Sequence, residues 1–160
     1  MTVEDLEQYG MSRMTDDEIH QLLSNQETGV LALPTDGVPS VRPMSFWFDG
    51  ESAVYFTYVG GSESRKAAAT AQASAARFLV YRTETPFNWR SALLTGPIEE
   101  VPDDEQTAVV DRMELAWRPE AFEQAEDSTA TTLYRLQITD REGLKQVERS
   151  TAFSTSDTHD

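Results

Sequence analysis

Two glycines, two serines, an arginine and a lysine lie between an aromatic run and an alanine-rich run in the segment YFTYVGGSESRKAAA. The glycines permit a sharp turn, and the alanines predict a helix that begins near Ser64. The first turn of a helix attracts anions because its N–H groups are unpaired and its dipole is positive there. Arg65 and Lys66 disfavour such a turn unless an anion is bound, so the pattern indicates an anion site. An ordinary capped helix, with both cations facing solvent or neighbouring acids, is the alternative.

A second cationic position, Arg42, lies in the expected strand SVRPM immediately before Pro43. Proline cannot donate to a sheet ladder, so this part of the strand is expected at an edge or a bulge. Such a break frees neighbouring backbone groups for a ligand, and the arginine can clamp an anion with two hydrogen bonds. A surface arginine on an edge strand is the alternative. The chain has no GxxxxGK[ST] and no GxGxxG, which are the fingerprints of nucleoside triphosphate and dinucleotide sites.

Other common catalytic groups are missing from the sequence or badly placed. The chain has no cysteine, which excludes disulfides, thiolate metal sites and cysteine nucleophiles. Its two histidines, His20 and His159, are expected in a surface helix and in the tail, so neither a histidine metal cluster nor a Ser-His-Asp triad is predicted. We interpret the acid pairs at 16–17, 99–100 and 103–104 as solvated surface.

The charge of the chain is strongly negative, with 28 Asp plus Glu against 13 Lys plus Arg and a net charge of -15. Lys66 and Lys145 are the only lysines. An acid-rich, lysine-poor surface is typical of proteins from salt-loving microbes, whose counterions screen the repulsion. The same field disfavours nucleic acids and anionic membranes as partners. Because no apolar run is long enough to span a bilayer and the N-terminus is acidic, we expect a cytoplasmic protein.

The order of elements predicts a mainly β fold. The segment TDDEIHQLLSN begins with a capping box, Thr15 and Glu18, and places Ile19, Leu22 and Leu23 on one helix face. Asp49-Gly50 is a hairpin turn signal. Six strands are expected at 27–34, 38–50, 51–59, 76–83, 88–101 and 131–139, and further helices at 64–72, 103–117 and 118–127.

These elements indicate one domain, because 160 residues suffice for one core. Residues 1–14 are expected to form an N-terminal arm, 15–150 the domain and 151–160 a polar, disordered tail. Short antiparallel strands with few helices predict a six-stranded antiparallel barrel with accessory α-helices.

The order of motifs resembles the FMN-binding split-barrel proteins related to pyridoxamine 5'-phosphate oxidase. The resemblance covers residues from about 28 to 101 and is carried by GVLALPTDGVPSVRPMSFWFDGESAVYFTYVGGSESRKAAAT, ARFLVY and NWRSALLTGPIEEV. It implies a six-stranded Greek-key split barrel, a homodimer, and FMN in two clefts at the dimer interface.

The resemblance also assigns cofactor contacts to particular residues. The flavin ring would receive backbone contacts, with an arginine near the phosphate, from Arg42, Pro43, Met44 and Ser45. The ring and ribityl chain would lie along Phe56, Thr57 and Tyr58, and the phosphate would be held by Ser64, Arg65 and Lys66. The partner subunit would approach the cofactor with Trp89, Arg90 and Ser91.

Two departures from the family pattern refine the expected function. The loop VGGSES is longer than the usual connection, and the C-terminal arginine- and proline-containing segment that holds the vitamin substrate is missing. We therefore expect an FMN-dependent oxidoreductase with an unidentified small substrate rather than an oxidase of vitamin B6. A deazaflavin-binding reductase and a non-catalytic flavin-binding or sensing protein are the alternatives.

Overall fold

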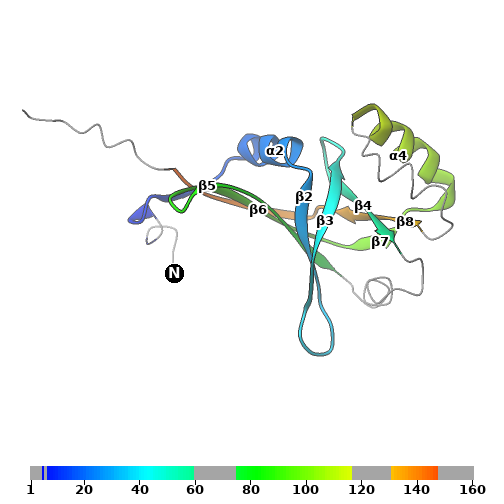
Figure 1. Ribbon diagram of the computed structural model, residues 1–160, viewed down its shortest axis with the longest axis horizontal. Helices are drawn as coiled ribbons and strands as arrows, with labels where there is room; N and C mark the ends of the chain where they lie inside the picture. The colour runs from blue at the N-terminus through cyan, green and yellow to red at the C-terminus, as the bar shows by residue number, and fades with distance from the viewer. Residues whose placement is uncertain (1–4, 6, 60–74, 117–130, 148–160) are drawn as a thin grey trace, which may run out of the picture.

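The computed structural model describes residues 5, 7–59, 75–116 and 131–147 (Figure 1). Its two main helices are α2 (Asp16–Asn25) and α4 (Asp103–Ala116). Its nine strands are β1 (Met11–Arg13), β2 (Thr28–Leu33), β3 (Ser40–Phe48), β4 (Ala53–Val59), β5 (Ala76–Thr85), β6 (Asn88–Gly96), β7 (Ile98–Glu100), β8 (Thr131–Gln137) and β9 (Asp140–Gln146). The expected helices at 64–72 and 118–127 and the tail at 151–160 lie outside the described residues.

All strand pairs that the structure describes are antiparallel, and the sheet order is β1-β9-β6-β5-β2-β3-β4-β8-β7. Among the described residues the sheet is not closed, and it has nine strands where six are expected. One of the additional strands, β9, has the sequence DREGLKQ, which carries few residues that favour strands. It pairs with β6 over seven residues, so long-range pairing overrides local preference.

The expected long strand at 88–101 is divided into β6 and β7 at Pro97. Before the break, the chain pairs with β5 and β9, and after it with β8. Proline has no N–H to continue a ladder, and Gly96 lies so close to β8 that an added Cβ would overlap the carbonyl oxygen of Gln137. The division therefore lets one chain segment serve two parts of the sheet.

The principal core lies on one face of this sheet and is closed by α2. The capping box is confirmed, because the Glu18 N–H donates to Thr15 Oγ1 and the Thr15 N–H donates to Glu18 Oε1, each at 3.2 Å. Its apolar face packs as expected, with buried residues Ile19, Leu22 and Leu23. The aromatic centre of this core is a group of edge-on rings, Phe46, Phe56 and Phe78.

A second, smaller core lies between α4 and the other face of β4 and β8. It contains Tyr55 and Leu133 from the sheet and Val109 and Met113 from the helix. In the described part of the chain, Phe56 and Tyr55 thus point from opposite faces of β4 into the two cores, and α2 and α4 lie over different parts of the sheet (Figure 1). Neither helix has the length and hydropathy that a membrane span requires.

The turn expected at Asp49-Gly50 is also confirmed. Asp49-Gly50 forms the turn between β3 and β4, with Gly50 at φ +86, a conformation that favours glycine. The Asp49 carboxylate accepts hydrogen bonds from three backbone N–H groups, those of Glu51, Ser52 and Ala53. Part of the expected N-terminal arm is ordered as β1, which pairs with β9.

Candidate flavin site

Strand β3 changes its partner along its length, and this change creates the candidate site. Residues 40–45 pair with β2, whereas residues 46–48 pair with β4. Pro43 lies in the first stretch, opposite Val30. In the described part of the chain no strand pairs with the other edge of this stretch, so Pro43 is at an edge, as its missing N–H predicts.

Alternation along β3 and β4 separates the predicted site residues into two sets. Met44 and Phe56 face the core and are 6% and 1% exposed, so a flavin could meet Phe56 only through its backbone. Arg42 lies on the same face of β3 as Met44 but beyond the edge of the core, where it is exposed. The opposite face carries Pro43 and Ser45, both exposed.

Thr57 lies on the same face of β4 as the buried ring of Tyr55, and its side chain is unusual. Its hydroxyl oxygen is buried and has no hydrogen-bond partner in the described part of the chain. An unpaired buried hydroxyl costs about 1–3 kcal/mol. Such a group in a native protein calls for an explanation, and a bound ligand that hydrogen-bonds to it is one.

The predicted residues of β6 also divide between two faces. Trp89 and Ser91 lie on the face away from α2, and the Trp89 Nε1–H donates to Gln146 Oε1 at 3.0 Å. Arg90 lies on the opposite face and lines a pocket beside α2. Arg90 therefore lies on a different face of the sheet from Trp89 and Ser91, the other two contacts predicted from this strand.

The remaining predicted residues fall partly or wholly outside the described residues. Tyr58 belongs to β4, where its backbone pairs with Thr132, but its side chain is outside them. Ser64, Arg65 and Lys66 are outside them altogether. The predicted phosphate contacts thus stay a prediction.

The β3–β4 residues and the β6 residues do not come together within one chain. Two strands, β2 and β5, separate β3 from β6 in the sheet. At about 4.8 Å between neighbouring strands, the separation along the sheet is about 14 Å. A site that uses both groups therefore requires either a ligand that spans this distance or a second copy of the chain.

The charged residues beside the second core form ion pairs that join neighbouring elements. Arg135 on β8 donates to Glu99 Oε1 at 2.6 Å and to Glu105 Oε2 at 2.8 Å, which raises the pKa of its guanidinium. These contacts tie β8 to β7 and α4. The described part of the chain contains no group of three or more His, Cys, Asp or Glu residues placed to hold a metal ion.

Sequence reasoning does not single out a further cation, Arg82. It is the cross-strand partner of Arg90 and lines the same pocket. Alternation along β5 could have found it, because Phe78 and Val80 face the core and Arg82 continues that register. The pairing with Arg90 depends on the register of the hairpin, which is not evident from either strand alone.

Comparisons with known proteins agree with this architecture. The model of the family described as pyridoxamine 5'-phosphate oxidase matches residues 15–145. A FAD-binding protein from Mesorhizobium loti is similar in structure, with a TM-score of 0.70, 17% identity, and coverage of 86% of this chain and 98% of that chain. For the FAD and heme binding protein from Mycobacterium smegmatis, the TM-score is 0.64 with 22% identity, and 87% and 74% of the chains are covered.

A FAD binding protein from Mycobacterium smegmatis is also similar, with a TM-score of 0.61, 15% identity, and coverage of 84% of this chain and 98% of that chain. At these identities the likeness concerns the fold. No curated protein matches the sequence.

Proposed function

The chain belongs to the pyridoxamine 5'-phosphate oxidase family, and on this premise we propose that it is an FMN-binding oxidoreductase acting on a small molecule. We further propose that its curved antiparallel sheet forms a split barrel, with the flavin along the outward face of β3 and β4. The structural relatives described as FAD-binding support a flavin as the cofactor.

The observation that carries the proposal is the buried Thr57 hydroxyl, which has no hydrogen-bond partner among the described residues. Thr57 lies on β4, next to the stretch of β3 that pairs with β2 alone. A flavin offers ring nitrogens, carbonyl oxygens and ribityl hydroxyls, any of which can hydrogen-bond to a threonine. The unpaired edge of β3 around Pro43 leaves space for the flavin ring beside the backbone. The residues present in this region therefore fit a flavin.

FMN is preferred over FAD because the sequence predicts one phosphate-binding cluster, Ser64, Arg65 and Lys66, and no dinucleotide fingerprint. When bound, FMN would supply hydride or electron transfer. The protein would bind and orient it through β3, β4 and the phosphate contacts.

A homodimer completes the proposed site. The outward face of β5 and β6 carries partly exposed apolar side chains, including Leu79, Tyr81 and Leu93, and no described element covers them. A second copy on this face would bring Trp89 and Ser91 of one chain toward the β3–β4 residues of the other. The β6 residues of one chain would then lie near the β3–β4 residues of the other, whereas within one chain two strands separate these groups.

The absorption spectrum of the purified protein tests the cofactor. Bound oxidised FMN gives a yellow protein with two visible bands, and chromatography of the released cofactor separates FMN, FAD and a deazaflavin. A protein that stays colourless after incubation with FMN would contradict the proposal. Reduction of a bound flavin by nicotinamide cofactors, followed at the same bands, separates an oxidoreductase from a non-catalytic flavin-binding protein.

The phosphate contacts have a separate test. The double change Arg65→Ala and Lys66→Ala removes two charge-assisted contacts, together worth about 3–6 kcal/mol, so FMN affinity measured in high salt should fall at least a hundredfold. Arg82→Ala removes an exposed cation on the α2 side of β5, opposite the proposed dimer face, and serves as the charge control. An unchanged affinity of the double variant would exclude this phosphate site.

A further inference from the structure

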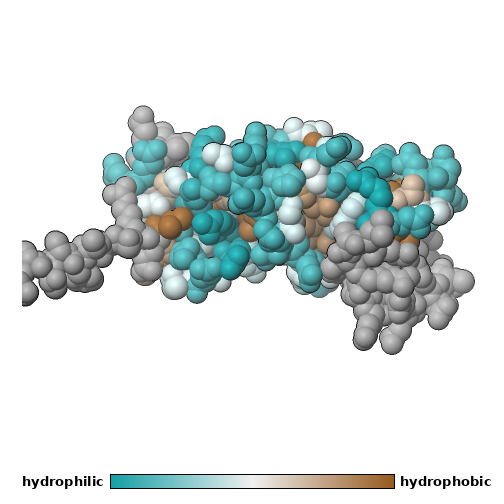
Figure 2. All heavy atoms as spheres, turned by 90° about the horizontal axis from the view of Figure 1, so that it is seen from above, coloured by the Kyte–Doolittle hydropathy of each residue, from teal (hydrophilic) through white to brown (hydrophobic). Residues whose placement is uncertain are grey.

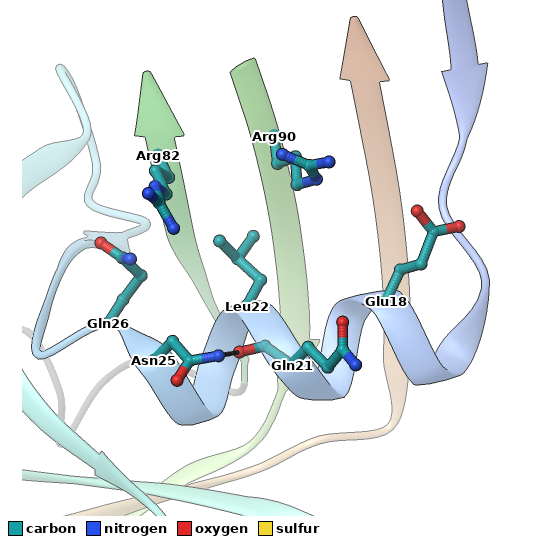
Figure 3. A pocket seen from close by; sticks show the side chains of 7 residues that line it. All are labelled: Glu18, Gln21, Leu22, Asn25, Gln26, Arg82 and Arg90. Carbon is teal, nitrogen blue, oxygen red and sulfur yellow. Dashed lines mark hydrogen bonds between the residues drawn. The ribbon is translucent and has the colours of Figure 1, made fainter. Parts of the chain in front are cut away.

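A second pocket lies between α2 and the hairpin of β5 and β6, away from the β3–β4 site (Figure 3). Leu22 lies at its apolar side, and Arg82 and Arg90 reach into it from adjacent strands. Facing them from α2 and the residue after it are the polar side chains of Glu18, Gln21, Asn25 and Gln26. The pocket thus joins two guanidinium groups, several amides and the Glu18 carboxylate, which is paired with Lys145.

The cations in this region lie opposite one another, which destabilises the fold. Arg90 is the cross-strand partner of Arg82 on one side and of Lys145 on the other. Like charges directly opposite each other in a sheet are destabilising. A chain with 28 acidic residues could readily place an acid at position 90, so three cations in one row need a reason other than stability.

The neighbouring acids neutralise two of these cations but not the third. Lys145 donates to Glu18 at 2.5 Å, and Arg82 pairs with Glu84 at 2.8 Å. Arg90 has neither an ion pair nor a hydrogen bond with any described residue, although it is only partly exposed. One positive charge therefore remains available in the pocket.

The pocket also offers uncommitted amides and a limited volume. The side-chain amides of Gln21 and Gln26 make no hydrogen bond in the described part of the chain, while Asn25 Nδ2 donates to the Gln21 carbonyl at 2.8 Å. The pocket volume is about 180 Å³. A cavity of roughly 150 Å³ holds benzene, so the pocket suits a group of about six to eight non-hydrogen atoms.

We propose that this pocket is a second binding site, which takes the oxyanion group of a small metabolite between Arg90 and Arg82. A guanidinium binds two oxygens of a carboxylate or phosphate in parallel hydrogen bonds. The amides of Gln21 and Gln26 complete the shell around the oxyanion. Arg90 belongs to this pocket rather than to the flavin site, and the proposal does not depend on the flavin.

Isothermal titration at fixed ionic strength tests the site, with inorganic phosphate and succinate as separate probes. Succinate binding with weak phosphate binding identifies a carboxylate ligand, and the reverse identifies a phosphate ligand. Arg90→Gln should weaken binding of the preferred probe about tenfold or more, because it removes a charge-assisted contact. Arg77→Gln, on the other face of β5, makes the same charge change and should leave binding within about twofold.

The thermal melting temperature adds a second readout. Without a probe, Arg90→Gln should melt at or above the wild-type temperature, because it relieves the repulsion with Arg82 and Lys145. With the probe, it should lose most of the stabilisation that the wild type gains. No saturable binding of either anion to the wild type, or equal losses in Arg90→Gln and Arg77→Gln, would overturn the proposal. A loss of FMN affinity in Arg90→Gln would instead assign Arg90 to the flavin.

Discussion

Replacing Thr57 with valine should have opposite effects on stability and on flavin binding. Valine has nearly the shape of threonine but no hydroxyl, and the Thr57 hydroxyl is buried without a partner. In the flavin-free protein, the change should raise the free energy of unfolding by about 1–3 kcal/mol, the cost of an unsatisfied buried polar group. For a chain of this length, the melting temperature should rise by about 2–12 °C.

The same change should weaken flavin binding. If the hydroxyl bonds to the flavin, its loss removes a hydrogen bond worth about 0.5–1.5 kcal/mol, a factor of about 2 to 13 in the dissociation constant. Urea unfolding of the flavin-free protein gives the first quantity, and quenching of FMN fluorescence gives the second. Both measurements use the same two proteins.

Thr139→Val is the matched control. The Thr139 hydroxyl donates to the Thr95 carbonyl at 3.1 Å, so its removal should lower stability and leave flavin affinity unchanged. A Thr57→Val protein that is less stable than the wild type without flavin would show that the hydroxyl is satisfied. Unchanged flavin affinity would remove Thr57 from the site.

Three further predictions concern the fold and the charge. Gly96→Ala should lower the free energy of unfolding by about 1–3 kcal/mol or more in urea titrations, because its Cβ would overlap the Gln137 carbonyl; Gly37→Ala, in an open position, should change it by less than about 1 kcal/mol. The pKa of Glu18 is lowered chiefly by the side-chain hydrogen bond from Lys145 and next by the hydrogen bond from the Thr15 backbone N–H. Its stabilising contribution should therefore be complete above the ordinary glutamate pKa of about 4.3 and lost as the pH falls through the lower folded-state pKa, a dependence that Glu18→Gln should remove. Raising KCl from about 0.15 M to 1 M shortens the Debye length from about 8 to 3 Å, so at a net charge of -15 the melting temperature should rise; a fall would argue against halophilic adaptation.

The surface explains why salt should matter. Figure 2 views the molecule from the side of α2 and α4, and this face is largely hydrophilic with small apolar areas between polar ones. Acidic residues occupy the first turns of both α2 and α4. They also stabilise their helices through the dipole, so they have a local structural role as well as a charge.

Local structure was determined by short stretches of the sequence. The capping box at Thr15 and Glu18, the apolar face of α2 and the Asp49-Gly50 turn each depend on residues within a few positions of one another. The proline in SVRPM likewise indicated a strand edge, because the missing N–H is a property of the residue itself. The family resemblance rested on the order of such local features.

Tertiary structure decided what pairs across the sheet. Strand β9 exists because β6 offers it a partner, and the segment 88–101 divides because β8 takes its second half. Register also placed Arg82, Arg90 and Lys145 in one row, whereas in the sequence they are separated positions with no common motif. Neighbouring residues of a strand face opposite sides, so the sequence alone grouped Trp89, Arg90 and Ser91, and the register of long-range pairing separated Arg90 from the other two.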